Sequence, residues 1–150
     1  MNPLLLRTVT ALALSGTAVG LVAAGQSEIT GDRLTRSLTS VYTNLYLQQA
    51  QILGRTTVTA TSMAALTTCD RGGPAVQDEG PGSDWVCHVL FTDPDGVRQD
   101  GSFEITVRSN GCYAATGPAR LNGPLMISDA TGQLVLNPVF EFDACFNPRG

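Results

Sequence analysis

Four cysteines limit what this chain can fold into more than any other feature. They are Cys69, Cys87, Cys112 and Cys145, separated by 18, 25 and 33 residues. A zinc site built from cysteine normally contains a closely spaced pair, so this spacing argues against zinc. Because no C-x-x-C motif occurs, it also argues against redox catalysis. An even number of cysteines in an exported protein predicts disulfides instead.

Four cysteines can pair in three ways. We expect Cys69 to pair with Cys87, because that bond would close the Gly/Pro-rich loop between them. We expect Cys112 to pair with Cys145, because that bond would tie the last strand back to the sheet. If disulfides act by restricting the unfolded chain, the two closed loops contribute about 3 and about 4 kcal/mol of stability.

The N-terminal segment predicts export. Residues 8–24 (TVTALALSGTAVGLVAA) carry no charge and follow Arg7. A signal-peptide apolar region spans about 7–15 residues and a membrane helix needs about 20, so the length fits neither class well. Residues 22–24 (VAA) would serve as a cleavage site, whereas the leucines at residues 4–6 extend the stretch enough to span. We therefore expect residues 1–25 to be a signal peptide or an uncleaved signal anchor.

The charge pattern argues against a nucleic-acid partner. The net charge is -4, all nine basic residues are arginine, and these are scattered among thirteen acids. Bidentate recognition of phosphate requires clustered arginines, and the sequence shows no basic stripe.

Residues 26–55 are expected to contain one amphipathic helix. Thr30 or Asp32 can cap its start and Gly54 can end it. The simplest prediction is a helix packed on a sheet. The alternative is a heptad seam for a partner helix, which Gln48 at a seam position weakens. The apolar residues expected on one face are Leu34, Leu38, Val41, Leu45 and Ile52, and that face is widened by Tyr42, Tyr46 and Leu53.

Beyond residue 54 the apolar period changes to two, which predicts antiparallel strands in residues 56–150. Residues 85–91 alternate clearly, with Trp85 and Cys87 on one face. Residues 70–84 are expected to form a loop. The fold class predicted is therefore α+β, with one helix before a sheet of five or six strands and two disulfides. The expected strands include residues 56–62, 85–91, 103–108, 125–128, 134–136 and 139–143.

Residues 110–111 (Asn-Gly) are the strongest hairpin signal in the chain. A two-residue turn at this point pairs Ser109 with Cys112. In that register Cys112 lies on the same face as Val107, which predicts a buried disulfide.

The sequence shows no catalytic constellation, and we expect neither an enzyme nor a cofactor or resident metal. His88 is the only histidine and alternates out of phase with Trp85, so we expect it on the opposite face of the sheet. No G-x-S-x-G motif is present. Glu141 and Asp143 are two residues apart, which alternation on a solvated strand face explains.

Two acidic segments carry oxygen ligands suited to calcium. Asp93 and Asp95 precede a glycine, and Asp100 follows soon after. This is not the EF-hand spacing, and a turn explains it better, so these three residues are only a candidate partner-binding or calcium-binding loop. The acids of residues 70–84 are explained by a solvated loop.

Several strings resemble those of uncharacterised actinobacterial envelope proteins, either secreted or membrane-anchored. The resemblance implies an extracytoplasmic domain behind a membrane segment, and it brings no catalytic residues with it. The strings are CDRGGP (69–74), GPGSDWVC (80–87), NGCY (110–113) and NPVFEFDACFNP (137–148).

Together these patterns favour a non-enzymatic, extracytoplasmic interaction or binding module of the cell envelope. We expect an envelope protein as partner, with membrane contact through the N-terminal segment if that segment is uncleaved. The alternative is a pilin-like or accessory subunit of a membrane complex, although the apolar stretch lacks the Glu and the processing motif of pilins. A small hydrolase is the third hypothesis.

Overall fold

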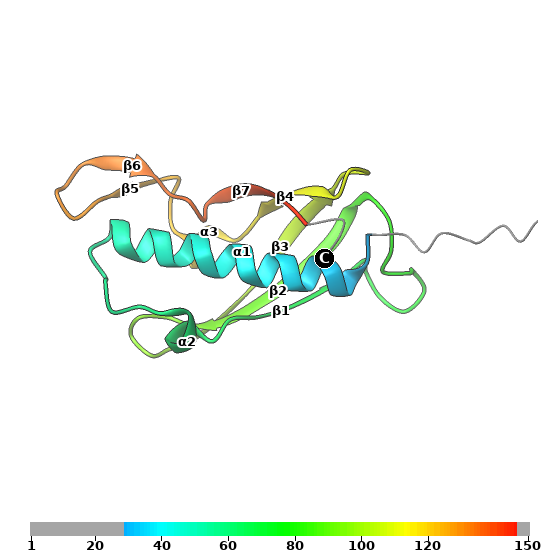
Figure 1. Cartoon of the computed structure of the whole chain (residues 1–150), viewed down its shortest axis with the longest axis horizontal. Coiled ribbons are helices and arrows are strands. Elements are labelled where there is room, and N and C mark those ends of the chain that lie inside the picture. Colours follow the sequence, from blue (N-terminus) through cyan, green and yellow to red (C-terminus); the bar gives the residue numbers. More distant parts are fainter. Residues whose placement is uncertain (1–28, 147–150) are drawn as a thin grey trace, which may run out of the picture.

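A computed structural model describes residues 29–146, and it has the α+β class predicted from the sequence. A long helix lies across one face of a five-stranded antiparallel sheet, and a small hairpin projects beyond the helix end (Figure 1). The elements are α1 (Gly31–Ile52), α2 (Ala60–Met63), β1 (Leu66–Asp70), β2 (Gly82–Thr92), β3 (Arg98–Val107), β4 (Cys112–Thr116), α3 (Ala119–Asn122), β5 (Met126–Ser128), β6 (Leu134–Leu136) and β7 (Glu141–Cys145).

The expected signal peptide or signal anchor, residues 1–25, lies outside the described residues. Within residues 29–146, the structure contains no helix with the length and apolar character needed to cross a membrane.

Helix α1 has the predicted start and end. Thr30 is the N-cap, and its hydroxyl oxygen accepts a hydrogen bond from the Arg33 N–H at 3.3 Å. Gly54, at φ 75°, lies just past the helix end. The helix packs on the sheet through the predicted face, with Tyr42 and Tyr46 buried and with Val41 and Leu45 half-buried against the core. Its buried residues are Gly31, Leu34, Leu38, Tyr42, Tyr46, Gln49 and Ala50.

The prediction of a strand at residues 56–62 is wrong, because the short helix α2 begins within this segment. The Thr59 hydroxyl accepts from the Ser62 N–H at 3.1 Å, and Ser62 Oγ accepts from the Thr59 N–H at 3.0 Å. Such reciprocal capping competes with strand pairing, and threonine content alone does not reveal it.

The main sheet has the strand order β1-β2-β3-β4-β7. The alternation predicted for β2 is confirmed, since Trp85, Cys87, Val89 and Phe91 all face the core. Tyr42 of α1 packs edge-on against Phe91 at 5.6 Å between ring centroids, and against Phe103 of β3 at 5.2 Å. The core therefore lies between α1 and one face of the sheet.

Both predicted disulfide pairings are confirmed. Cys69–Cys87 joins directly opposite residues of β1 and β2, with a Cα–Cα distance of 4.1 Å. Cys112–Cys145 joins directly opposite residues of β4 and β7, with a Cα–Cα distance of 3.8 Å. Each bond therefore fixes a strand register as well as closing a loop.

The register predicted for the β3–β4 hairpin is wrong by one residue. The Arg108 N–H donates to the Cys112 carbonyl at 2.8 Å, so the connection has three residues, with Gly111 at φ 78°. Val107 pairs with Tyr113, and Tyr113 takes the core position. Cys112 consequently lies on the other face, half-buried, and the prediction of a buried Cys112 disulfide is wrong.

Strands β5 and β6 were expected from the sequence, but they do not join the main sheet. They form a separate two-stranded antiparallel hairpin in which Met126 pairs with Leu136. The hairpin lies at the C-terminal end of α1, where the Ala130 N–H donates to the Ile52 carbonyl at 3.0 Å (Figure 1).

Candidate functional site

The base of the β5–β6 hairpin is held by a buried network of amide side chains. Gln49 of α1 donates to the Asn137 Oδ1 at 2.9 Å and to the Asn122 carbonyl at 2.8 Å. Asn137 donates in turn to the Asn122 and Pro124 carbonyls, at 2.7 and 2.8 Å. An isolated two-stranded hairpin is only marginally stable. The hydrogen bonds of this network join the base of the β5–β6 hairpin to α1 and so fix where the hairpin lies relative to the helix.

The hairpin carries large apolar side chains on its outward face. Met126, Leu134 and Leu136 are 40%, 67% and 67% exposed, whereas Ile127 on the opposite face is buried. Because Met126 and Leu136 are cross-strand partners and Leu134 is two residues away, the three share one face. We call this surface the hairpin face. Apolar side chains gathered on one exposed surface are typical of a protein–protein contact.

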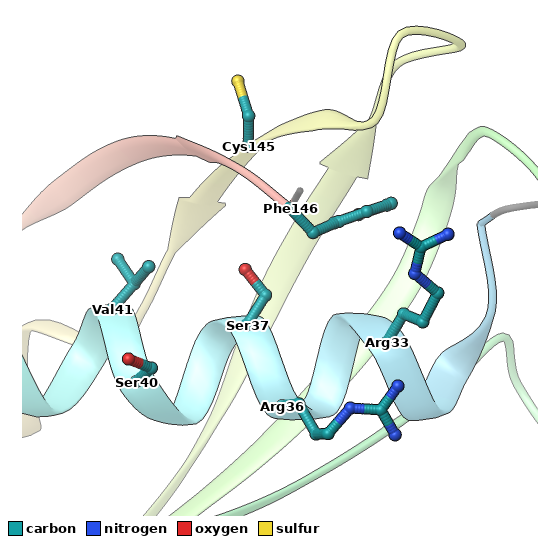
Figure 2. A pocket seen from close by; sticks show the side chains of 7 residues that line it. All are labelled: Arg33, Arg36, Ser37, Ser40, Val41, Cys145 and Phe146. Atoms are coloured by element: carbon teal, nitrogen blue, oxygen red, sulfur yellow. The ribbon is translucent and has the colours of Figure 1, made fainter. Parts of the chain in front are cut away.

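A second surface, a hollow of about 370 Å³, lies between α1 and the end of β7. Arg33, Arg36, Ser37 and Ser40 of α1 line one side, and Phe146 lines the other (Figure 2). In Figure 2 the Arg33 side chain rises from α1 beside the Phe146 ring, whereas the Arg36 side chain lies on the other side of the helix and extends toward its start. We call this surface the arginine pocket.

The arginine pocket is held in shape by contacts to the sheet. The Arg33 guanidinium lies 5.6 Å from the centroid of the Phe146 ring. The Ser37 hydroxyl shares a 3.0 Å hydrogen bond with the Tyr113 hydroxyl, and burial raises the pKa of that phenol. Arg33 and Arg36, three residues apart on α1, both line this pocket.

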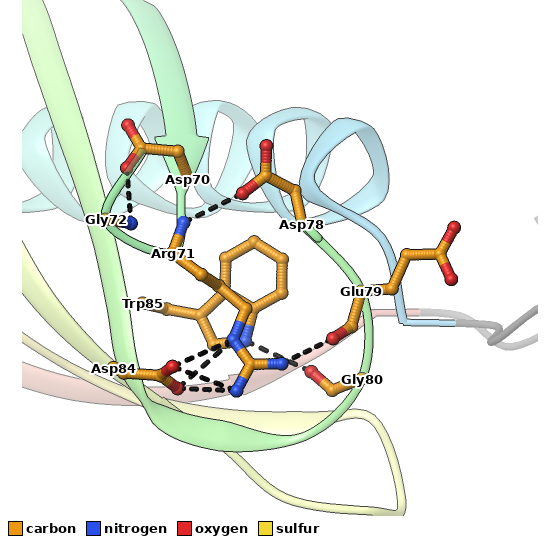
Figure 3. A network of polar contacts seen from close by, with 8 residues as sticks. All are labelled: Asp70, Arg71, Gly72, Asp78, Glu79, Gly80, Asp84 and Trp85. Atoms are coloured by element: carbon orange, nitrogen blue, oxygen red, sulfur yellow. Dashed lines mark hydrogen bonds and ion pairs between the residues drawn. The ribbon is translucent and has the colours of Figure 1, made fainter. Parts of the chain in front are cut away.

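A third polar cluster organises the loop between β1 and β2, and it is drawn in Figure 3. The Arg71 guanidinium donates through Nε and Nη2 to the Asp84 carboxylate, with the Nη2 contacts at 2.8 and 2.9 Å. It also lies 5.6 Å from the centroid of the Trp85 ring and donates to the Glu79 carbonyl. Hydrogen bonding to Arg71 lowers the pKa of Asp84.

The other acids of this loop also serve its own structure. The Asp78 carboxylate accepts from the Arg71 N–H at 2.8 Å, and the Asp70 carboxylate accepts from the Gly72 N–H at 2.8 Å (Figure 3). The Trp85 indole donates to the Gly80 carbonyl at 3.1 Å. The loop was expected to be merely solvated, and the sequence did not show that Arg71 organises it.

The candidate calcium residues lie in and near the turn between β2 and β3. The Asp93 carboxylate accepts from the N–H groups of Val97 and Asp95, both at 2.9 Å, and from the Gln99 amide at 2.8 Å. These bonds, that from Val97 above all, lower the pKa of Asp93. Asp95 and Asp100 are exposed. The described part of the chain contains no group of three or more His, Cys, Asp or Glu able to hold a metal.

His88 lies on the exposed face of the sheet, as predicted from its phase. Its Nδ1 shares a 3.0 Å hydrogen bond with the Ser102 hydroxyl on β3, a pair that the sequence did not reveal. Glu141 and Asp143 are on β7, three strands away in the sheet, and Asp143 contacts Arg108 at 3.5 Å. The structure does not bring His88 and these two carboxylates together.

The chain matches no family model, no curated protein and no solved structure in comparisons with known proteins. The proposals that follow therefore depend on the chemistry and geometry of the residues themselves.

Proposed function

We propose that this chain is a non-enzymatic interaction module that works outside the cytoplasm and docks an envelope protein through the hairpin face. The observation that carries the proposal is the exposure of Met126, Leu134 and Leu136 on one side of a hairpin with a fixed base. Two disulfides are consistent with an extracytoplasmic or secreted protein, because such bonds persist in oxidising compartments.

The surroundings of the hairpin face suit a docking site. The buried Gln49–Asn137 contact holds the base, so little ordering entropy is lost on binding. Polar residues at the tip, including Asp129 and Thr131, bond to one another at 2.7 Å and are available as a rim. An apolar centre with a polar rim is the usual anatomy of a specific interface.

Site-directed photo-crosslinking of the full chain in its own envelope tests the proposal. A photoreactive amino acid at Leu134 should give a defined heterologous product. The same group at Val97, which is also exposed and apolar (53%) but lies in the β2–β3 turn, should not. Replacing Leu136 with Ser in the Leu134 probe should reduce that product severalfold. Equal products from positions 134 and 97 would contradict the proposal.

A pilin-like subunit is the second candidate, and one observation favours it. A long helix lies over an antiparallel sheet whose last strand is tied back by Cys112–Cys145 (Figure 1). A crosslink from Leu134 to a second copy of the chain, together with an intact mass that retains residues 1–24, would support this candidate. Cleavage after Ala24 would remove the apolar segment that such an assembly needs.

A further inference from the structure

We propose that the free edge of β1 binds the C-terminal segment of another protein as an added strand, a function separate from docking at the hairpin face. β1 is the first strand in the sheet order, so it pairs with β2 on one edge and with no described strand on the other (Figure 1). A hollow of about 520 Å³ lies between α1, α2 and β1. We call it the edge pocket, and the residues that line it include Thr35, Arg36, Thr39, Thr43, Ala60 and Thr67.

The backbone of Thr67 points its hydrogen-bonding groups away from β2. Cys69 lies opposite Cys87 at a Cα–Cα distance of 4.1 Å, close to the roughly 4.5 Å of an antiparallel pair that exchanges no backbone hydrogen bonds. The Cys69 N–H donates instead to the Thr35 hydroxyl on α1, at 3.1 Å. Because these directions alternate along a strand, Thr67 points its N–H and carbonyl to the same outer edge.

The two backbone groups of Thr67 are left unpaired by the helices. Within residues 29–146, no hydrogen bond joins the Thr67 backbone to α1 or α2. The Thr39 and Thr43 hydroxyls donate to carbonyls of α1 itself, at 2.8 and 2.7 Å. The Thr67 hydroxyl is buried and also has no partner among the described residues, although buried polar groups normally have one. An unpaired strand edge is a template for a further strand, which binds through main-chain hydrogen bonds.

One end of this edge is closed by α1, so a strand added beside Thr67 cannot continue past Cys69. A Cβ placed on Gly31 of α1 would lie 3.0 Å from the Cys69 carbonyl oxygen. This close approach and the Thr35–Cys69 hydrogen bond leave no room for a strand beside Cys69. A segment that runs in the direction of β1 therefore places its C-terminal carboxylate at the closed end.

Arg36 supplies the charge that a terminal carboxylate requires. Among the described residues that line the edge pocket, it alone is charged. Figure 2 shows its side chain on the side of α1 opposite Phe146, extending toward the helix start. Arg36 is exposed and takes part in neither ion pair found in residues 29–146. A guanidinium binds a carboxylate through two parallel, charge-assisted hydrogen bonds.

The two faces of the sheet add side-chain recognition. Successive side chains of an added strand lie on opposite faces, so one set faces the edge pocket. The other set lies beside Leu66, which is 62% exposed and sits on the outer face with its cross-strand partner Leu90. We therefore expect the bound segment to carry an apolar residue next to Leu66.

Selection from a library of random octapeptides, displayed with free C-termini, supplies the probe for the full chain in detergent. We expect one enriched sequence family with an apolar residue at a fixed position. A synthetic peptide of that family should bind at least about tenfold more tightly than the same peptide with an amidated C-terminus. No enriched family, or equal binding of the acid and the amide, would overturn the proposal.

Amide hydrogen exchange, followed by NMR with and without that peptide, locates the bound strand. The Thr67 N–H should exchange at least about tenfold more slowly in the complex, because it gains a hydrogen bond. The Cys69 N–H, already bonded to Thr35, should change little. Protection confined to β5 and β6 would place the peptide on the hairpin face and contradict the proposal. Protection of the Thr67 N–H in the chain alone, lost on dilution, would identify a second copy as the occupant and contradict it too.

Matched variants at exposed positions separate the edge pocket from the rest of the surface. Ala60→Trp fills the pocket, whereas Thr61→Trp places the same ring on the next residue of α2, which does not line it. Arg36→Gln removes the charge at the closed end, and Arg55→Gln removes an exposed charge elsewhere. Ala60→Trp and Arg36→Gln should each raise the Kd of the peptide by at least about tenfold, and each control by less than about twofold. Equal effects within either pair would count against strand addition at this edge.

Discussion

Gln49 on α1 and Asn137 after β6 are joined by a hydrogen bond of 2.9 Å, although 88 residues separate them in the chain. Both side chains are buried. The Asn137 amide also donates to the Asn122 and Pro124 carbonyls, and its Oδ1 accepts a hydrogen bond from the Val139 N–H. One amide side chain therefore connects the main helix, α3 and the base of the hairpin that presents the hairpin face.

Asn137→Ala should destabilise the protein and loosen the hairpin. It removes the Asn137 side chain as partner of the Pro124 carbonyl, the buried Val139 N–H and one N–H of the Gln49 amide, and each buried group left unpaired costs about 1–3 kcal/mol. We expect the free energy of unfolding to fall by at least about 2 kcal/mol in guanidinium titrations, with faster hydrogen exchange in β5 and β6. Gln48→Ala, an exposed amide on the same helix, should change it by less than about 0.5 kcal/mol. Equal effects of the two variants would show that the network does not hold the hairpin.

The two disulfides should differ in their response to a mild reductant. Cys145 is exposed and Cys112 half-buried, whereas Cys87 is fully buried in the core. Because thiol exchange requires access to sulfur, Cys112–Cys145 should open first and cost up to about 4 kcal/mol of stability. Timed alkylation followed by peptide mass analysis measures the order. Labelling of Cys69 and Cys87 before Cys112 would contradict the exposures described above.

Local patterns predicted much of this fold, because they depend on neighbouring residues. Alternation placed Trp85 and Cys87 in the core, and the loop between the first two cysteines indicated their pairing. The prediction of a strand at residues 56–62 is wrong, because the Thr59–Ser62 capping box stabilises a helical turn instead.

The arginine pocket and the hairpin face could not be predicted from the sequence. The arginine pocket depends on Phe146 returning to the first turns of α1, a contact that only the finished sheet creates. The hairpin face depends on β5 and β6 leaving the main sheet, although both strands were predicted. Both surfaces form through contacts between segments that are far apart in the chain, and the spacing of residues in the sequence does not predict such contacts.

The register of the β3–β4 hairpin can be tested at Gly111. Its φ of 78° is left-handed, and a Cβ there would lie 3.3 Å from the Phe146 ring. Gly96 has a similar φ of 79° with nothing within 4 Å, so Gly96→Ala reports the backbone strain alone. We expect Gly96→Ala to cost about 1–2 kcal/mol and Gly111→Ala to cost more, measured by chemical unfolding. Equal costs would mean that Phe146 does not pack against this turn.

The last prediction concerns the ion pair of Arg71 with Asp84. Bonding to Arg71 lowers the pKa of Asp84 in the folded protein below its unfolded value of about 3.9. A group with a lowered folded pKa adds stability above its unfolded pKa and loses it as pH falls through the folded pKa. Asp84→Asn should therefore lower the Tm at neutral pH, and the difference from the natural chain should shrink steadily below about pH 4.

Thermal unfolding followed by circular dichroism from pH 2 to pH 8 measures this convergence. Asp95→Asn removes the same charge from the exposed β2–β3 turn, where the side chain of Asp95 makes no ion pair with the described residues. Its Tm should follow that of the natural chain across the range. Asp93 and Asp129 also have lowered pKa values, so the natural chain and both variants lose stability in acid. Only the difference in Tm between the natural chain and Asp84→Asn isolates the contribution of Asp84. A difference that stays constant down to pH 2 would mean that the Asp84 carboxylate contributes through its shape and not through its charge.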